Sequence, residues 1–431
     1  MMKLVNTHAF GPRLAVSKHV LENGLKVLLL PDRFAPVACL QLWYGVGSRD
    51  ERPGKTGIAH LFEHLMFNQT SSLAPGEFDR RMEEAGGETN AGTWIDWTYY
   101  RDNLPAQSLG LALSLEAERM QHLVLGETQV ETEREVVANE RRFRVDDDVE
   151  GFLSEQLFKM AFQVHAYGSP IIGWMDDILA LTTSDCREFY KTYYAPNNAT
   201  LVVVGDVDPA PTLELVSRHF GSIPPSTLPT RQLSTEPPQV HERRATFAKP
   251  VGADRAVLGY KAPSQADPDW IPLKLTHELL AGGNSSRLHR RLIVEKEIVS
   301  TIRGFLLPSC DPGVLQLYLT MKPGHQAAEA LEVIDEELER LHKEPPTPDE
   351  MSRARNRLET EFWSDLETAE EKAETLGHYE TTSGDYRTLF QVAQAVPRVN
   401  ADDVVRVARR FLGHEQRTVV LATPQGDEVS P

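Results

Sequence analysis

Two parts of the chain, 218 positions apart, follow the same pattern of residues. Residues 189–205 fall on residues 407–423, and each stretch passes from the end of a helical pattern through a polar turn into a Val-rich strand. The same shift places residues 37–48 over residues 255–266. Because separate stretches share one offset, the pattern indicates a duplicated domain of about 200 residues.

Apolar runs and turn residues indicate which elements the chain contains. Residues 25–30 and 37–44 are apolar and are bounded by proline, aspartate or glycine, as strands are. Helices are expected from the spacing of apolar residues at 56–67, 77–87, 107–124 and 127–145. The aromatic-rich composition of 89–105 predicts two extended segments there. Strands and helices alternate, so we expect an α+β fold built from mixed α/β layers.

A proline-rich stretch divides the two copies. Residues 221–240 contain five prolines together with serine and threonine, and they show no apolar period. The chain of 431 residues is also too long for one compact core. We therefore predict an N-terminal domain at 1–220, a linker at 221–243 and a homologous C-terminal domain at 244–431.

Composition argues against several classes of protein. The 63 acidic and 45 basic side chains leave a net charge of −18, which argues against a nucleic-acid partner. No run of about 18 apolar residues suggests a membrane span, and the N-terminus lacks the continuous apolar region of a signal peptide. The cysteines Cys39, Cys186 and Cys310 lie far apart, so neither a disulfide framework nor a thiolate zinc site is indicated, and a cytoplasmic location is predicted.

Two histidines and a glutamate interrupt an apolar helical stretch, in "HLFEH" at residues 60–64. His60 and His64 are four apart, so they lie one turn apart on one helix face and can direct ring nitrogens at one ion. Glu63 lies beside them, within reach of a metal-bound water. This H-x-x-E-H order is the inverzincin zinc motif. The alternative is a half-buried histidine pair with Glu63 as a surface partner.

A catalytic zinc site needs a third protein ligand, and residues 130–144 offer candidates. Glu133 and Glu140 are seven apart, or two helical turns, and we expect them to share an inward face with Val136 and Val137. A carboxylate on such a face is costly unless it is paired or bound to a metal. An exposed helix with charge pairs one turn apart would explain the same residues equally well, and the residues alone leave this choice open.

"HLFEH", followed 76 residues after His64 by the last glutamate of "EREVVANE", resembles the pitrilysin, insulysin and mitochondrial processing peptidase family of zinc metallopeptidases. The resemblance extends over most of the chain, through "LENGLKVLLLPD", "GVGSRDE", "TNAGTWIDWTYY", "HAYGSPIIGWMDDI" and "FYKTYYAPNNATLVVVGDVD". It implies one zinc ion with His60, His64 and Glu140 as its ligands. It further implies Glu63 as the general base and Glu133 as a carboxylate that supports the site.

The resemblance also implies how a substrate binds. Residues Asn90, Ala91, Gly92 and Thr93 correspond to an edge strand that binds an extended peptide by main-chain pairing. A strand with a polar start would be the simpler interpretation of the same residues. The implied reaction is the hydrolysis of short or unfolded peptides, and the two domains would form half of a clamshell chamber. The alternatives are a catalytically silent scaffold and a zinc-dependent peptide-binding module.

The second half departs from the family pattern. Family members carry there an arginine and a tyrosine, seven residues apart, that reach the substrate carbonyl. Alignment on "SSRL" places Ile293 and Ser300 at those positions, and a one-residue gap places Val294 and Thr301 there instead. Because none of these side chains can stabilise an oxyanion as the family pair does, the resemblance implies a zinc-bearing subunit whose partner is a related, zinc-free chain. A homodimer is the second possibility.

Overall fold

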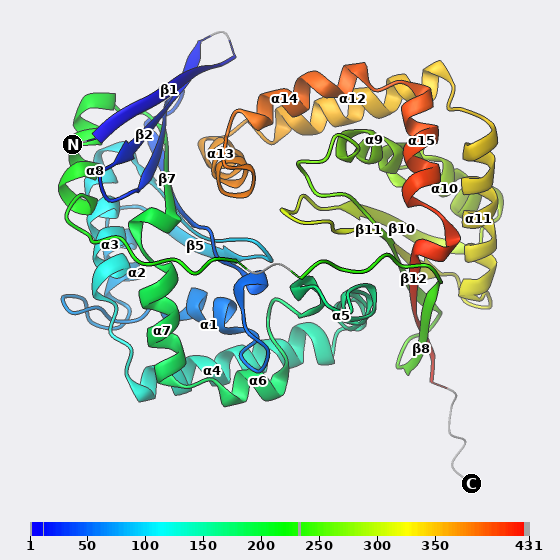
Figure 1. Ribbon diagram of the computed structural model, residues 1–431, viewed down its shortest axis with the longest axis horizontal. Coiled ribbons are helices and arrows are strands. Elements are labelled where there is room, and N and C mark those ends of the chain that lie inside the picture. Colours follow the sequence, from blue (N-terminus) through cyan, green and yellow to red (C-terminus); the bar gives the residue numbers. More distant parts are fainter. Residues whose placement is uncertain (1, 12, 232–233, 426–431) are drawn as a thin grey trace. The chain divides into compact units, whose positions relative to one another are not determined.

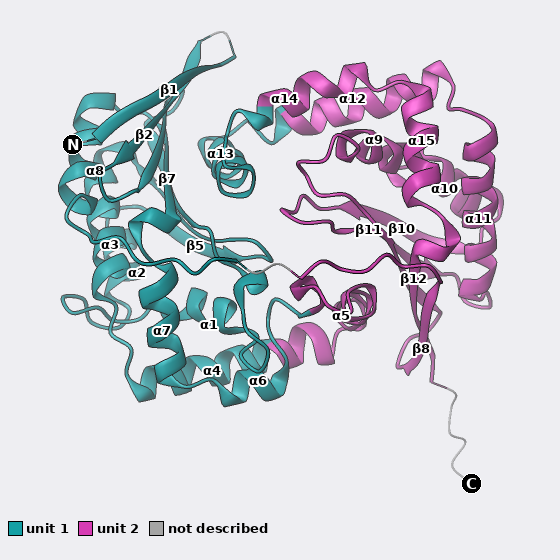
Figure 2. Cartoon of the chain, viewed as in Figure 1, with its two compact units in different colours: residues 1–140, 169–232, 363–389 teal, residues 141–168, 233–362, 390–431 magenta. Residues whose placement is uncertain are grey.

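The computed structural model describes residues 2–11, 13–231 and 234–425, which form two compact units of mixed α/β structure (Figure 2). Unit 1 contains residues 1–140, 169–232 and 363–389, and unit 2 contains residues 141–168, 233–362 and 390–431. Each unit has its own sheet (Figure 1). Among the described residues, no helix combines the length and the apolar character needed to cross a bilayer.

The sheet of unit 1 has seven strands in the order β1-β2-β3-β7-β4-β6-β5. Its strands are β1 (Met2–Phe10), β2 (Leu14–Leu21), β3 (Lys26–Pro31), β4 (Val37–Tyr44), β5 (Glu88–Thr93), β6 (Thr98–Pro105) and β7 (Ala199–Gly205). Strands β3 and β7 pair in parallel, and the other neighbours pair antiparallel. Strand β5 is therefore an edge of the sheet, with an unpaired side.

One face of this sheet packs against most of the helices of unit 1. They are α1 (Ile58–Leu65), α2 (Glu77–Glu84), α3 (Leu109–His122), α4 (Glu127–Arg141), α6 (Met175–Ala180), α7 (Thr183–Tyr193) and α8 (Pro209–Phe220). The central strand β4 shows why a second helical layer is needed. Leu40 and Leu42 join the main core of unit 1, whereas the alternate side chains Gln41 and Trp43 are buried on the opposite face.

Helix α13 (Ala369–Ser383), which comes from the second half of the sequence, covers that opposite face. It contacts β4 and β7. A Cβ at Gly377 would lie 2.1 Å from Trp43 Nε1. The helix backbone therefore lies too close to Trp43 for any residue larger than glycine. Gln41 Nε2 donates a hydrogen bond to the backbone oxygen of Glu370 at 3.2 Å.

Unit 2 repeats this plan with five strands in the order β10-β11-β9-β12-β8. The strands are β8 (Arg243–Lys249), β9 (Arg255–Lys261), β10 (Val299–Leu306), β11 (Val314–Met321) and β12 (Arg417–Pro424). The helices are α5 (Val149–Ala161), α9 (Trp270–Ala281), α10 (Arg287–His289), α11 (Ala327–Lys343), α12 (Pro348–Ser364), α14 (Thr388–Ala395) and α15 (Ala401–Phe411). Strands β8 and β12 form the parallel pair. Helix α5 contacts β9 and β12, and a Cβ at Gly259 of β9 would lie 2.9 Å from Leu157 Cδ1 of α5.

The expected duplication is confirmed, because β4 and β9 begin 218 residues apart, as do β7 and β12. The compact units nevertheless differ from the contiguous domains 1–220 and 244–431. Unit 1 takes α13 from the second half, and unit 2 takes α5 from the first half. The physical reason is that each central strand is buried on both faces, and the covering helix comes from the other copy.

Two side chains of the expected linker are hydrogen-bonded to the compact units. Arg231 donates to Asp50 from Nε at 2.7 Å and from Nη2 at 3.1 Å, which ties the first part of the linker to unit 1. Glu236 accepts hydrogen bonds from the backbone N–H groups of residues 163–165, at 2.9 to 3.0 Å, which ties the last part to unit 2.

Candidate metal centre

Helix α1 begins at a position that only glycine can occupy. Gly57 has a φ of 86°, and a Cβ there would lie 2.5 Å from the backbone oxygen of Ile172. Glu51 accepts hydrogen bonds from the N–H groups of Gly57 and Ala59, each at 2.9 Å. The apolar side chains of α1 are buried in the core of unit 1, namely Ile58, Leu61, Phe62 and Leu65. This anchoring fixes the direction of the polar residues between them.

His60, His64 and Glu140 converge on one point. One ligand atom from each of the three lies within 4.8 Å of the others. The Nε2 atoms of His64 and His60 are 3.3 and 3.6 Å from Glu140 Oε2. Two imidazole nitrogens and one carboxylate oxygen form a donor set that zinc takes in catalytic sites, with the fourth position left to water. The three side chains therefore fit a zinc ion.

Behind His64 lies a second carboxylate. Glu133 Oε2 is 3.6 Å from His64 Nδ1, and Glu133 Oε1 accepts a hydrogen bond from Asn68 Nδ2 at 3.0 Å. A carboxylate near Nδ1 favours a proton on that nitrogen, which leaves Nε2 to face Glu140. Asn68 was not expected from the sequence. Its only signal there is its spacing of four residues from His64.

The carboxylates around His64 govern its charge. Burial by itself would lower the pKa of His64, but Glu133 and Glu140 favour the protonated ring and raise the pKa to about 9. For Glu133, burial opposes the shift, and contacts with His64 and Asn68 hold its pKa below the usual range. A metal ion would replace the proton.

Glu63 is half-buried on α1, between the two histidines in sequence. Its negative charge contributes to raising the pKa of His64. A helix places residues three apart on neighbouring turns, so Glu63 is on the same side of α1 as His60. The position suits a base beside the metal, and that role stays a prediction.

Strand β5 lies next to this cluster. Helix α1 contacts β5, and β5 pairs only with β6 among the described strands. The four residues expected to bind a peptide backbone are Asn90, Ala91, Gly92 and Thr93, and all lie on this edge strand. The structure thus places them on an open sheet edge beside the candidate metal ligands, whereas their binding role stays a prediction.

One detail of the expected helix face is wrong. Val137 is fully buried, but Val136 is 44% exposed. Successive helical residues are rotated by roughly 100°. Glu133, Val137 and Glu140 follow spacings of four and three along one face, whereas Val136 turns away from it toward solvent.

A zinc protease from Helicobacter pylori, named PqqE, is 34% identical to this chain over 409 residues, which are 94% of this chain and 92% of the relative. The chain belongs to peptidase family M16. The family profile described as "Insulinase (Peptidase family M16)" matches residues 26–174 of this M16 chain, which include the candidate ligands. The profile described as "Peptidase M16 inactive domain" matches residues 180–358.

Other relatives agree with this assignment. The mitochondrial-processing peptidase subunit beta of Lentinula edodes is 27% identical, covering 96% of this chain and 90% of the relative. The crystal structure of a protease from Helicobacter pylori superposes with a TM-score of 0.90 at 33% identity, covering 98% of this chain and 100% of that one. A structure titled as a peptidase M16 inactive domain from Pseudomonas fluorescens has a TM-score of 0.85 at 18% identity, which supports the fold alone.

In unit 2 of the M16 chain, α9 is the first α-helix after β9, as α1 is the first after β4 in unit 1. Helix α9 carries His277 and Glu278, and Arg357 Nε of α12 donates to Glu278 Oε2 at 2.9 Å. Within the described ranges, His60, His64 and Glu140 are the only group of three or more side chains that could hold a metal.

The segment that differs from the family pattern contains a π-helix, Arg290–Glu295. Val294, which the gapped alignment selects, lies in this π-helix, and Thr301 lies on β10. Both are exposed, and neither is ionisable. The nearby Arg291 is engaged elsewhere, because its Nη2 donates to Glu336 at 2.9 Å.

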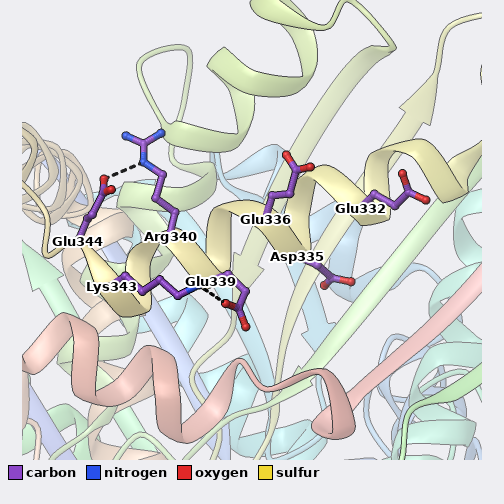
Figure 3. Close-up of a pocket in the computed structure, with 7 residues that line it drawn as sticks. All are labelled: Glu332, Asp335, Glu336, Glu339, Arg340, Lys343 and Glu344. Carbon is purple, nitrogen blue, oxygen red and sulfur yellow. Dashed lines mark hydrogen bonds and ion pairs between the residues drawn. The ribbon is translucent and has the colours of Figure 1, made fainter.

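Acidic residues gather on the exposed side of α11, and Figure 3 shows the side chains that line a hollow there. It is lined by Glu332, Asp335, Glu336, Glu339, Arg340, Lys343 and Glu344. Lys343 pairs with Glu339 at 2.8 Å and Arg340 with Glu344 at 3.2 Å, each one helical turn apart. Such pairs are typical of a solvated helix face, so this hollow is not a second candidate site.

Proposed function

We propose that this M16 chain is a zinc-dependent endopeptidase that hydrolyses short or unfolded peptides bound along β5. The observation that carries the proposal is the approach of His64 Nε2 and His60 Nε2 to Glu140 Oε2, at 3.3 and 3.6 Å. Its second support is the family, whose relatives include proteins named as zinc proteases. An open sheet edge beside the ligands suits a substrate bound as an added strand.

Each residue of the site has a defined task in this proposal. His60, His64 and Glu140 would hold the zinc ion, which when bound supplies a Lewis acid and lowers the pKa of water to about 7. The Glu63 carboxylate accepts the proton of the attacking water and passes it to the leaving amine nitrogen. Glu133 holds the proton of His64 on Nδ1.

The test is a Glu63→Gln variant. We expect it to bind zinc as the wild type does and to lose hydrolysis of an unfolded peptide, measured with a fluorogenic substrate. Glu84→Gln, on the exposed end of α2, is the control and should keep both properties. Hydrolysis by Glu63→Gln at the wild-type rate would eliminate Glu63 as the base. Failure of the wild type to cleave any unfolded peptide, with zinc bound, would instead favour the scaffold alternative.

We further propose that the active form contains a second, related chain. The supporting observation is that neither Ile293 and Ser300 nor Val294 and Thr301 offers a cation and a phenol. A zinc-free partner with that arginine and tyrosine should increase turnover strongly when added to this chain. Full turnover by this chain alone, with a second-order dependence on its concentration at dilution, would favour the homodimer instead.

A further inference from the structure

Five residues between β4 and α1, residues 47–51, contact both parts of the proposed site. On one side they hold the loop that joins β5 to β6. The N–H groups of Ser48 and Arg49 donate to the backbone oxygens of Trp94 and Ile95 at 3.2 and 2.9 Å. Arg49 Nη1 is 3.0 Å from Asp96 Oδ1, and both side chains are almost completely buried. This turn is thus joined to the end of the edge strand by main-chain bonds and by a buried ion pair.

On the other side the same segment holds the start of α1. The first N–H groups of a helix have no partners within the helix. Glu51 supplies acceptors for two such groups, because Oε2 accepts from Gly57 and Oε1 accepts from Ala59, each at 2.9 Å. Gly57 has no side chain that could cap the helix in its place. Ala59 directly precedes His60, so the contact with Glu51 fixes the backbone that carries the first candidate ligand.

The segment itself has little freedom to adjust. A Cβ at Gly47 would lie 2.3 Å from the backbone oxygen of Trp94. The backbone of the turn therefore lies too close to the backbone of the loop for any side chain at position 47. Asp50 Oδ2 accepts a hydrogen bond from the N–H of Gly47 at 3.2 Å, which closes the turn on itself. These contacts hold residues 47–51 in one conformation, so the strand contact and the helix contact keep fixed places along the segment.

We propose that residues 47–51 are a positioning segment that sets the register between the peptide-binding edge strand and the metal-binding helix. Arg49 acts on the strand through Asp96, and Glu51 acts on the helix through its first N–H groups. This inference rests on the proposed function, because it assigns the two contacts to substrate placement and to metal placement. The two residues should differ in effect. Changes at Glu51 should alter zinc binding, and changes at Arg49 should alter substrate binding but not zinc binding.

The test for Glu51 measures zinc binding by competition with a chromophoric chelator, so it does not depend on turnover. Glu51→Ala should weaken zinc binding about tenfold, the scale found when outer residues that orient metal ligands are removed. Glu51→Gln keeps one acceptor oxygen and should fall between Glu51→Ala and wild type. The control is Glu236→Ala, which removes a carboxylate that also accepts several backbone hydrogen bonds, but in unit 2. It should lower thermal stability and leave zinc affinity unchanged.

The test for Arg49 separates KM from kcat on an unfolded peptide. Arg49→Ala should raise KM severalfold and leave zinc affinity within twofold of wild type, and Arg49→Lys should restore part of the KM because it keeps a cation against Asp96. Asp96→Asn is the milder second variant if Arg49→Ala does not fold, and it should raise KM in the same direction.

Two results would overturn the positioning role. One is wild-type zinc affinity in Glu51→Ala. The other is a fall in zinc affinity together with a rise in KM in both the Arg49 and the Glu51 variants, in proportion to their loss of stability. A merely structural segment would behave in that way. If the wild-type chain itself neither binds zinc nor cleaves peptides, the proposed function fails, and this result is distinct from the other two.

Discussion

Glu133 has different neighbours at its two oxygens. Oε2 lies 3.6 Å from His64 Nδ1, and Oε1 accepts from Asn68 at 3.0 Å. The amide of Asn68 holds the carboxylate in place, and the carboxylate in turn orients the ring. A negative charge near Nδ1 also makes Nε2 a better donor to a metal. The charge of Glu133 should therefore matter to zinc binding, although Glu133 is not expected to touch the ion.

We predict that Glu133→Gln weakens zinc binding about tenfold with little change in thermal stability. Glutamine keeps the size of the side chain and can still interact with Asn68, but it removes the charge near His64. Chelator competition measures the effect. Glu131→Gln, at an exposed position of the same helix, is the matched control and should bind zinc as the wild type does. Equal affinities for Glu133→Gln and wild type would limit Glu133 to a packing role.

Asp102 is a buried carboxyl on β6 in unit 1. Its side chain is fully buried, and a neighbouring polar group is the carboxyl of Glu116. The nearby Arg119 is paired with Glu116. Burial, and then the charge of Glu116, raise the pKa of Asp102 well above its usual range. One arginine thus faces two carboxyl groups, and Asp102 favours its protonated form.

The raised pKa of Asp102 has a defined effect on stability. The folded chain holds the Asp102 proton more tightly than the unfolded chain does, so stability falls as pH rises above the usual range of an aspartate. We predict that Asp102→Asn matches wild type near pH 4 and exceeds it at pH 8, by about 1–3 kcal/mol. Thermal unfolding at both pH values measures the difference. A variant less stable than wild type at pH 8 would show that the Asp102 charge is needed.

At the scale of elements, the packing of α13 on the sheet depends on one glycine. Gly377 lies against the indole of Trp43, which is 1% exposed on β4. A methyl group at position 377 would overlap the indole nitrogen, and Trp43 has no room to move. The contact also accounts for a glycine in the middle of a helix, where it otherwise costs about 1 kcal/mol relative to alanine.

Gly377→Ala should therefore destabilise the protein by about 1–3 kcal/mol, although alanine favours helix. Chemical denaturation followed by tryptophan fluorescence measures the change. Gly110→Ala provides the control within α3 of the same unit, because a Cβ there would meet only Leu215 Cδ1 at an ordinary 3.9 Å. It should be neutral or stabilising. A stabilising Gly377→Ala would mean that α13 can shift away from the strand.

Much of the element pattern was predictable from local signals. Strand β4 begins and ends at the expected residues, because proline and glycine bound an apolar run. The convergence of His60, His64 and Glu140 also follows from helical spacing and the family pattern. Asn68 and Glu51 were missed because each is one polar residue in a loop, and its importance depends on which backbone group it meets. The packing of α13 on β4 and β7 was not predicted, because the apolar face of a helix does not specify which strand it will cover.

At the scale of the whole molecule, neither unit is a continuous piece of chain. All seven strands of the first sheet come from residues 2–205, but one face of that sheet is covered by residues 369–383. The buried residues on that face include Cys39, Gln41 and Trp43. A fragment that ends in the linker would expose them to water.

We predict that residues 1–243 expressed alone do not form a stable fold, and that co-expression with residues 244–431 restores a soluble complex. Far-UV circular dichroism and binding of a hydrophobic dye measure the state of the fragment. The control is a full-length chain cleaved at one site in the linker, which should stay folded because both covering helices are present. A stable, cooperatively unfolding fragment 1–243 would show that α13 is dispensable for the first sheet.

The late position of α13 also matters while the protein is being made. Every strand of the first sheet has left the ribosome once residue 205 has, yet the helix that shields its second face ends at residue 383. At synthesis rates of about 5–20 residues per second, the nascent chain waits roughly ten seconds or longer with that apolar surface open. During this interval Trp43 and its neighbours stay in contact with water, and in the finished protein they are buried.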